Sequence, residues 1–143
     1  MKIMQISIFL ENRKGRLHEV TSLLGNNKIN IRALNIAETG DFGVMRLVVD
    51  KPQEALALLK SKNFVASTTD IVAIEVADKP GGLAEVLKTI TDNNVNIEYM
   101  YGFVEKRSDQ ALLVFRFDNA DNAVAALKQN GIKIVTESEI KSL

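Results

Sequence analysis

The segment Asp78-Lys79-Pro80-Gly81-Gly82-Leu83 contains the residue types best suited to ligand chemistry in this chain. Its two glycines let a backbone pass close to a ligand, because no Cβ stands in the way. Backbone N–H groups at a helix start favour a carboxylate, and Asp78 could receive an ammonium group. A free amino acid carries both groups, so the segment predicts an amino-acid site. The same residues also suit a purely structural turn, in which Asp78 caps the helix and Pro80 starts it.

A second copy of this segment occurs earlier in the chain, because the sequence repeats itself. When it is shifted by 66 positions, residues 12–31 align with residues 78–97, and seven of these 20 positions are identical. The identical pairs are Gly15 and Gly81, Leu17 and Leu83, Glu19 and Glu85, Val20 and Val86, Asn27 and Asn93, Asn30 and Asn96, and Ile31 and Ile97. The turn at 78–83 therefore has a counterpart at 12–17.

The later part of each copy also repeats, at a slightly different spacing. A shift of 68 aligns residues 50–60 with residues 118–128, and Asp50 recurs as Asp118. The two extra residues fall in a predicted hairpin turn, which spans 105–109 in the second copy and 39–41 in the first. Hairpin turns tolerate such insertions.

Each copy predicts the element order β-α-β-β-α-β. Alternating apolar residues predict first strands at 4–10 and 72–76. After each of these strands, apolar residues recur at helical spacing and predict a first helix. Apolar runs at 29–36 and 42–49, with counterparts at 95–104 and 110–117, predict the two middle strands. Second helices are expected near 52–62 and 119–130, and closing strands near 64–67 and 132–136. The tail at 136–143 is expected to extend the last strand or to hang free.

The predicted fold is therefore α+β, with two ferredoxin-like βαββαβ units. Each unit has a four-stranded antiparallel sheet with both helices on one face, since the crossovers are right-handed. We expect the first unit at residues 1–69 and the second at 70–143. The apolar runs at 44–49 and 111–117 further predict that another copy or a second chain covers the other faces.

Composition excludes several functional classes. The 143 residues include 18 Lys and Arg and 18 Asp and Glu, and this balance argues against nucleic-acid binding. With no Cys and one His, thiol catalysis and Cys- or His-rich metal sites are excluded, and we predict no cofactor. No apolar run is long enough for a membrane span, and the N-terminal segment is interpreted as a strand, so we expect a cytoplasmic protein.

The stretch from Asp78 to Met100 resembles the opening of the ACT domain, a regulatory module of amino-acid metabolism. An acidic residue, Pro-Gly, a hydrophobe, an amphipathic helix and Asn-Ile follow one another in the order typical of that family. The first copy is less similar, since Asn12 and Lys14 replace the acidic residue and the proline. With both repeats, the resemblance covers residues 3–137.

The resemblance implies that ligands bind at the interface between two ACT domains. The contacts come from the first strand-to-helix turn of one domain and the Asn-Ile strand of its neighbour. Carried over to this chain, the implied ligand-binding residues are Asn12, Arg13, Lys14, Gly15, Arg16, Leu17, Asn30, Ile31, Asp78, Lys79, Pro80, Gly81, Gly82, Leu83, Asn96 and Ile97. Because Asn12 and Lys14 depart from the pattern, we expect the second turn to be the better site.

Two further groups allow a structural and a functional interpretation. Asn30 and Asn96 suit ligand contact, but they also suit a turn, because Asn tolerates unusual backbone angles. Tyr99, Tyr101 and Phe103 alternate along a strand, where they would line a pocket or pack at an interface.

The sequence thus predicts an amino-acid-binding regulatory protein without catalytic activity. Its expected partners are a free amino acid, a second copy in a homodimer and, as a candidate, a metabolic enzyme. The alternative is a protein-interaction module that kept the fold and lost the ligand. An enzyme is not favoured, since no nucleophile–base pair or metal cluster is visible.

Overall fold

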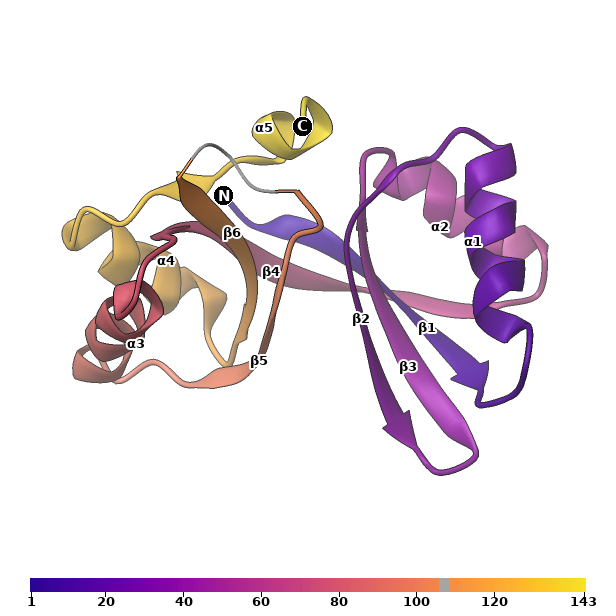
Figure 1. The fold of residues 1–143 in the computed structure, drawn as a ribbon, viewed down its shortest axis with the longest axis horizontal. Coiled ribbons are helices and arrows are strands. Elements are labelled where there is room, and N and C mark those ends of the chain that lie inside the picture. Colours follow the sequence, from indigo (N-terminus) through magenta and orange to yellow (C-terminus); the bar gives the residue numbers. More distant parts are fainter. Residues whose placement is uncertain (106–108) are drawn as a thin grey trace. The chain divides into compact units, whose positions relative to one another are not determined.

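The computed structural model describes residues 1–105 and 109–143 (Figure 1). The chain divides into two compact units. The first unit is Met4–Thr69, and the second comprises Asp70–Leu143 together with Met1–Ile3. The predicted hairpin turn at 105–109 lies mostly outside the described residues.

The first unit has the predicted βαββαβ order. Its elements are β1 (Ile3–Glu11), α1 (Arg16–Asn26), β2 (Ile31–Thr39), β3 (Phe42–Val49), α2 (Pro52–Ser61) and the start of β4 (Val65–Ala77). The strands run in the order β2-β3-β1-β4. In the antiparallel register, Ile8 lies opposite Met45 and Leu10 lies opposite Gly43.

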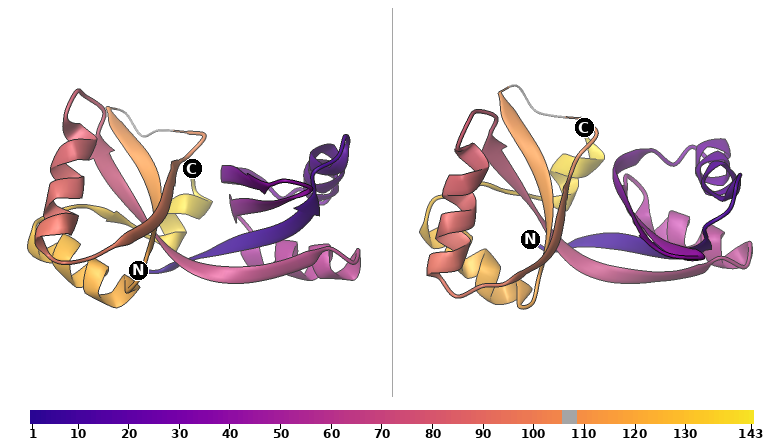
Figure 2. Two further views of the ribbon diagram at one scale, coloured as in Figure 1. Left: turned by 90° about the horizontal axis from the view of Figure 1, so that it is seen from below. Right: turned by 60° about the horizontal axis from the view of Figure 1, so that its bottom comes forward.

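The second unit repeats this arrangement. It contains the rest of β4, α3 (Gly82–Asp92), β5 (Ile97–Gly102), β6 (Gln110–Phe117), α4 (Ala120–Gln129), β7 (Ile134–Val135) and α5 (Glu137–Lys141). Strand β6 and strand β7 both pair with β4, and β5 pairs with β6, all antiparallel. Helices α3 and α4 lie side by side against these strands (Figure 2). The α+β class and the ferredoxin-like order are therefore confirmed.

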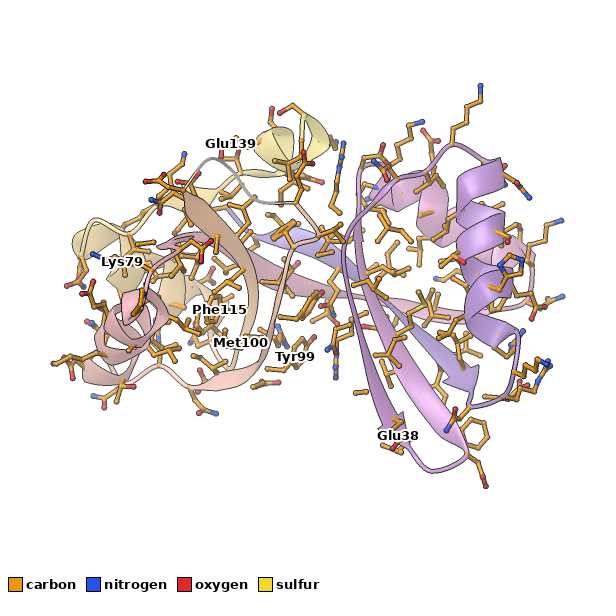
Figure 3. All side chains as sticks on the ribbon, viewed as in Figure 1. Glu38, Lys79, Tyr99, Met100, Phe115 and Glu139 are labelled. Carbon is orange, nitrogen blue, oxygen red and sulfur yellow. The ribbon has the colours of Figure 1, made fainter. Side chains whose placement is uncertain are left out.

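The cores of the two units use matching positions of the repeat. Val20 and Leu24 of α1 are buried in the first core, as are Val86 and Ile90 of α3 in the second. In the second unit, Met100 and Phe115 are opposite each other in the sheet and point toward the core (Figure 3). Helical and strand periodicity thus located most core-facing residues correctly, but Leu17, at the same helical spacing as Val20 and Leu24, is 45% exposed.

The recurring asparagines and aspartates fix the junctions between elements. Asn27 and Asn93 end α1 and α3, and each side-chain amide donates to the carbonyl four residues earlier, at 2.9 and 2.8 Å. A second contact joins the start of β2 to the start of α2. The Asn30 N–H donates to Asp50 Oδ1 at 2.9 Å, and the Asp50 N–H donates back to the Asn30 carbonyl at 3.1 Å.

The second unit repeats that reciprocal contact. The Asn96 N–H donates to Asp118 Oδ1 at 3.2 Å, and the Asp118 N–H donates to the Asn96 carbonyl at 3.1 Å. These bonds use the backbone of each asparagine and the side chain of each aspartate. The identities Asn30/Asn96 and Asp50/Asp118 therefore have a structural explanation within each unit.

Two details of the prediction were wrong. The strands expected separately near 64–67 and 72–76 form one continuous strand, β4, because no turn residue such as Gly or Pro interrupts Val65–Ala77. The tail neither extends a strand nor hangs free. It forms α5, whose N-cap Thr136 accepts a hydrogen bond from the Glu139 N–H at 3.2 Å and whose Ile140 is buried. The prediction that other chains or copies cover the sheet faces stays a prediction.

Candidate functional site

The first strand-to-helix turn is held against the β2–β3 hairpin by its first residue. The Asn12 N–H donates to the Asp41 carbonyl at 2.6 Å, and its side-chain amide donates to the Gly40 carbonyl at 3.0 Å. Gly15, the N-cap of α1, has φ of 90°, a left-handed conformation that disfavours a side chain. The turn is thereby fixed at both ends while its middle faces solvent.

Charged side chains gather on this turn. Glu11 accepts a hydrogen bond from Arg13 Nε at 2.7 Å and lies 3.6 Å from Arg16. The hydrogen bond from Arg13 and the charge of Arg16 lower the pKa of Glu11, and the same bond raises the pKa of Arg13. Arg16 also pairs with Glu19 at 2.9 Å and stacks over the Phe64 ring at 4.9 Å. The Arg16 side chain is consequently only 16% exposed.

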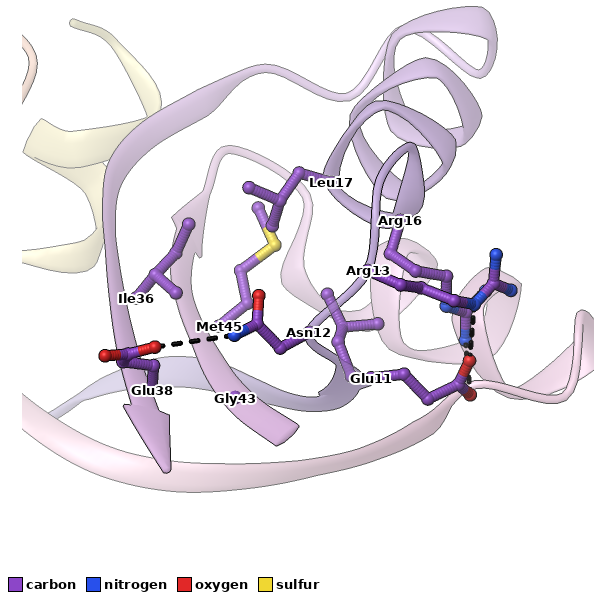
Figure 4. Close-up of a pocket in the computed structure, with 10 residues that line it drawn as sticks. Glu11, Asn12, Arg13, Arg16, Leu17, Ile36, Glu38, Gly43 and Met45 are labelled. Carbon is purple, nitrogen blue, oxygen red and sulfur yellow. Dashed lines mark hydrogen bonds and ion pairs between the residues drawn. The ribbon is translucent and has the colours of Figure 1, made fainter. Parts of the chain in front are cut away.

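A pocket of about 90 Å³ opens beside this turn (Figure 4). Its walls come from the end of β1, the start of α1, the end of β2 and the start of β3. The lining residues are Leu10, Glu11, Asn12, Arg13, Arg16, Leu17, Ile36, Glu38, Gly43 and Met45. All of them belong to the first unit.

Glu38 differs from the other charges of the pocket. Asn12 Nδ2 donates to its Oε2 at 3.4 Å, which is its single partner among the described residues. In Figure 4, Glu38 and the cluster of Glu11, Arg13 and Arg16 lie on opposite sides of Asn12. The pocket therefore has an acidic group on one side and, on the other, two basic groups that are paired with Glu11.

The second turn has the same backbone bend but different surroundings. Its N-cap Gly81 has φ of 83°, matching Gly15. The next residue, Gly82, is buried, and a Cβ built on it would lie 2.0 Å from the Ala77 carbonyl oxygen. Its N–H already donates to the Lys79 carbonyl at 3.0 Å. The glycine pair is thus required by packing at Gly82 as well as by the bend at Gly81.

The structural interpretation, in which Asp78 caps this helix and Pro80 starts it, was wrong. Helix α3 begins at Gly82 after the N-cap Gly81, so Pro80 precedes the helix and Asp78 does not occupy the cap position. Asp78 is exposed, and its N–H donates to the Asp109 carbonyl at 3.1 Å. Lys79 is exposed as well, and Leu83 packs against the second core.

The structure brings some of the predicted site residues together and separates others. Asn12, Arg13, Arg16 and Leu17 line the pocket, whereas Lys14 and Gly15 are exposed on the same turn. Asn30 and Ile31 lie at the start of β2, while the pocket uses the end of that strand. Asn96 and Ile97 hold the matching place at the start of β5.

Sequence reasoning missed the hairpin side of the pocket. Ile36, Glu38, Gly43 and Met45 were treated only as strand residues. A usable signal was present, because Glu38 aligns with Val104 in the repeat and is a charge that the other copy lacks.

Comparison with known proteins establishes the family. A model of the ACT domain pair matches residues 1–143. The chain belongs to the ACT domain pair family. The expected resemblance is therefore confirmed, and both units are ACT domains.

Solved structures of the same fold include one relative of substantial identity. Protein BT0572 from Bacteroides thetaiotaomicron is 40% identical, with a TM-score of 0.94 over 100% of this chain and 98% of that one. The regulatory subunit of aspartate kinase from Thermus thermophilus, in a ligand-free form, is 19% identical, with a TM-score of 0.64 over 88% and 91% of the two chains. The corresponding subunit from Thermus flavus is 21% identical, with a TM-score of 0.60 over 88% and 90%. No curated protein sequence matches the chain.

The described part of the ACT domain pair has neither a metal-binding cluster nor a helix suited to crossing a membrane. No group of three or more His, Asp or Glu residues there could hold a metal ion. Among the described helices, none combines the length and the apolar character that crossing a membrane requires.

Proposed function

We propose that this ACT domain pair is a regulatory protein that binds a free amino acid at its first strand-to-helix turn. The observation that carries the proposal is the pocket beside Asn12 and Leu17, which combines acidic, basic and apolar walls. A zwitterion presents both charges and a side chain, so each kind of wall has a counterpart in the ligand. Membership of the ACT family supports the same class of ligand.

The first turn is favoured over the second, in contrast to the expectation from sequence. Glu11, Arg16 and Glu38 of the first copy align with Ala77, Gly82 and Val104 of the second. The second turn therefore lacks the three charged groups at these positions. A role for Asp78 and Lys79 in a further ligand site stays a prediction.

Regulation would follow from ligand-linked stability. A ligand that binds only the folded state stabilises it by about 2.7 kcal/mol at 100 times its Kd. If the paired state of two ACT domains binds more tightly, the ligand shifts the assembly equilibrium by the difference in affinity. Completion of the site by an Asn-Ile strand of a neighbouring domain, a homodimer, a metabolic enzyme as partner and a cytoplasmic location all stay predictions.

The test is isothermal titration of the purified protein with each of the twenty amino acids. We expect saturable heat for at least one of them, together with a rise in the thermal midpoint at saturating ligand. Absence of heat and of any midpoint shift for all twenty would contradict amino-acid binding and would favour the interaction-module alternative.

A further inference from the structure

We infer that the first-turn pocket selects a net-neutral amino acid with a short aliphatic side chain, of the size of alanine or valine. The inference rests on the proposed function and adds the class of ligand. It also assigns two residues outside the predicted turn, Glu38 and Gly43, as determinants of selectivity.

The charge of the pocket favours a net-neutral ligand. Its lining includes two carboxylates, Glu11 and Glu38, and two guanidinium groups, Arg13 and Arg16, so the formal charges cancel. A ligand with an additional charge would leave that charge uncompensated, because the carboxylate and guanidinium groups of the pocket are equal in number. A zwitterion with an uncharged side chain matches the balance.

Glu38 is the group that receives the ligand ammonium. Ionised carboxylates have about four acceptor sites, and the described residues supply one donor, the Asn12 amide at 3.4 Å. Glu11, by contrast, is already engaged by Arg13 at 2.7 Å and by Arg16 at 3.6 Å. Of the two carboxylates that line the pocket, Glu38 therefore has more acceptor sites available for a ligand ammonium group.

The size of the pocket limits the side chain. A water-sized group needs about 10–15 Å³ of pocket space, so a pocket of about 90 Å³ holds roughly six to nine non-hydrogen atoms. Alanine has six and valine eight, whereas phenylalanine has twelve. Its apolar walls are Leu10, Leu17, Ile36 and Met45. A methyl or isopropyl group fits this space, whereas an aromatic ring does not.

Gly43 determines how much of this space is open. It is buried and lies opposite Leu10 in the sheet, so a Cβ there would point to the same side as Leu10, toward the pocket. That Cβ would be 3.5 Å from the Ala37 carbonyl oxygen and 3.9 Å from Ile36 Cγ2, which are ordinary contacts. The matching position of the second copy is Ala111, so the fold accepts a methyl group at this place.

The experiment is isothermal titration with alanine, valine, phenylalanine, glutamate and lysine. It compares the wild type with Gly43→Ala, Glu38→Gln and the control Glu85→Gln. Glu85 is an exposed carboxylate at the start of the other turn's helix and does not line the pocket. Circular dichroism and thermal midpoints confirm that each variant is folded.

We expect alanine or valine to bind best. Gly43→Ala should weaken valine at least fivefold and alanine about twofold or less, because overpacking grows with side-chain size. Glu38→Gln should weaken both at least tenfold, through loss of a charge-assisted hydrogen bond. Glu85→Gln should leave both unchanged.

Two outcomes overturn this inference while leaving the proposed function standing. One is preferential binding of glutamate, lysine or phenylalanine. The other is binding of alanine or valine with affinities that Gly43→Ala and Glu38→Gln do not change. Absence of binding by all twenty amino acids instead overturns the proposed function itself.

Discussion

Replacing Gly82 by Ala tests whether the second glycine of the turn is there for packing. Alanine is the better helix former by about 0.5–1 kcal/mol, so helix propensity alone predicts a small gain in the free energy of unfolding. The structure predicts the opposite sign. The new Cβ would lie 2.0 Å from the Ala77 carbonyl oxygen, which already accepts a hydrogen bond from the Lys79 N–H at 2.9 Å.

The size of the destabilisation follows from the atoms that the new Cβ displaces. Overpacking costs about 1–3 kcal/mol, and displacing the Ala77 carbonyl weakens a hydrogen bond worth about 1 kcal/mol. After the gain in propensity is subtracted, Gly82→Ala should lower the free energy of unfolding of the second unit by about 1–3 kcal/mol. Gly25→Ala is the matched control, because a Cβ at this position in α1 meets nothing within 4 Å. It should be stabilising by about 0.5–1 kcal/mol.

Urea unfolding followed by two signals provides the assay. The chain has two tyrosines and no tryptophan, and both tyrosines, Tyr99 and Tyr101, lie on β5. Tyrosine fluorescence therefore reports the second unit, while circular dichroism reports both. The packing explanation of Gly82 is refuted if Gly82→Ala leaves the fluorescence transition unchanged or moves it to higher urea.

Three smaller changes test other contacts of the fold. Asp118→Ala should lower the free energy of unfolding by about 1 kcal/mol, because the Asn96 N–H loses its acceptor, whereas Asp118→Asn keeps an oxygen there and should cost less; equal urea midpoints for the two variants would count against this contact. Because its pKa is lowered in the fold, Glu11 contributes stability that is present at neutral pH and lost as the pH falls through that lowered value. The thermal midpoints of wild type and Glu11→Gln should therefore differ at pH 7 and converge in acid, and a constant difference would contradict the pairing with Arg13. Thr136→Ala removes the N-cap of α5 and should lower the free energy of unfolding by about 1 kcal/mol, and an unchanged urea midpoint would show that the cap does not stabilise the fold.

Much of the fold could be predicted because the repeat reports the same local physics twice. Gly15 and Gly81 recur since both bends need a left-handed residue, with φ of 90° and 83°. Asp50 and Asp118 recur since each accepts a backbone N–H at the junction of a helix and a strand. A residue that recurs in both copies therefore marks a position that the fold needs. Recurrence alone does not tell such a position from a ligand contact.

The candidate site was harder to predict, because it depends on where the two copies differ. Gly-Gly in the second turn matched the family pattern, yet the burial of Gly82 against Ala77 becomes visible only in three dimensions. The pocket of the first copy depends on Glu38 and Gly43, which are 26 or more residues away from Asn12 in sequence. They reach the turn through strand pairing and the hairpin contact from Asn12 to Gly40. The spacing of residues along the chain does not show that Glu38 and Gly43 lie beside the first turn.

The most direct test of amino-acid binding at the first turn is a titration followed by the backbone amide resonances of the ¹⁵N-labelled protein. Each of the twenty amino acids is added in turn. The reporters are Gly15 in the first turn and Leu17 and Gly43 in the pocket, and Gly81 is the reference in the second turn. We predict saturable shifts of the first-turn reporters with at least one amino acid, while Gly81 stays in place. Resonances that remain unmoved at Gly15, Leu17 and Gly43 for all twenty, or shifts confined to Gly81, would contradict it.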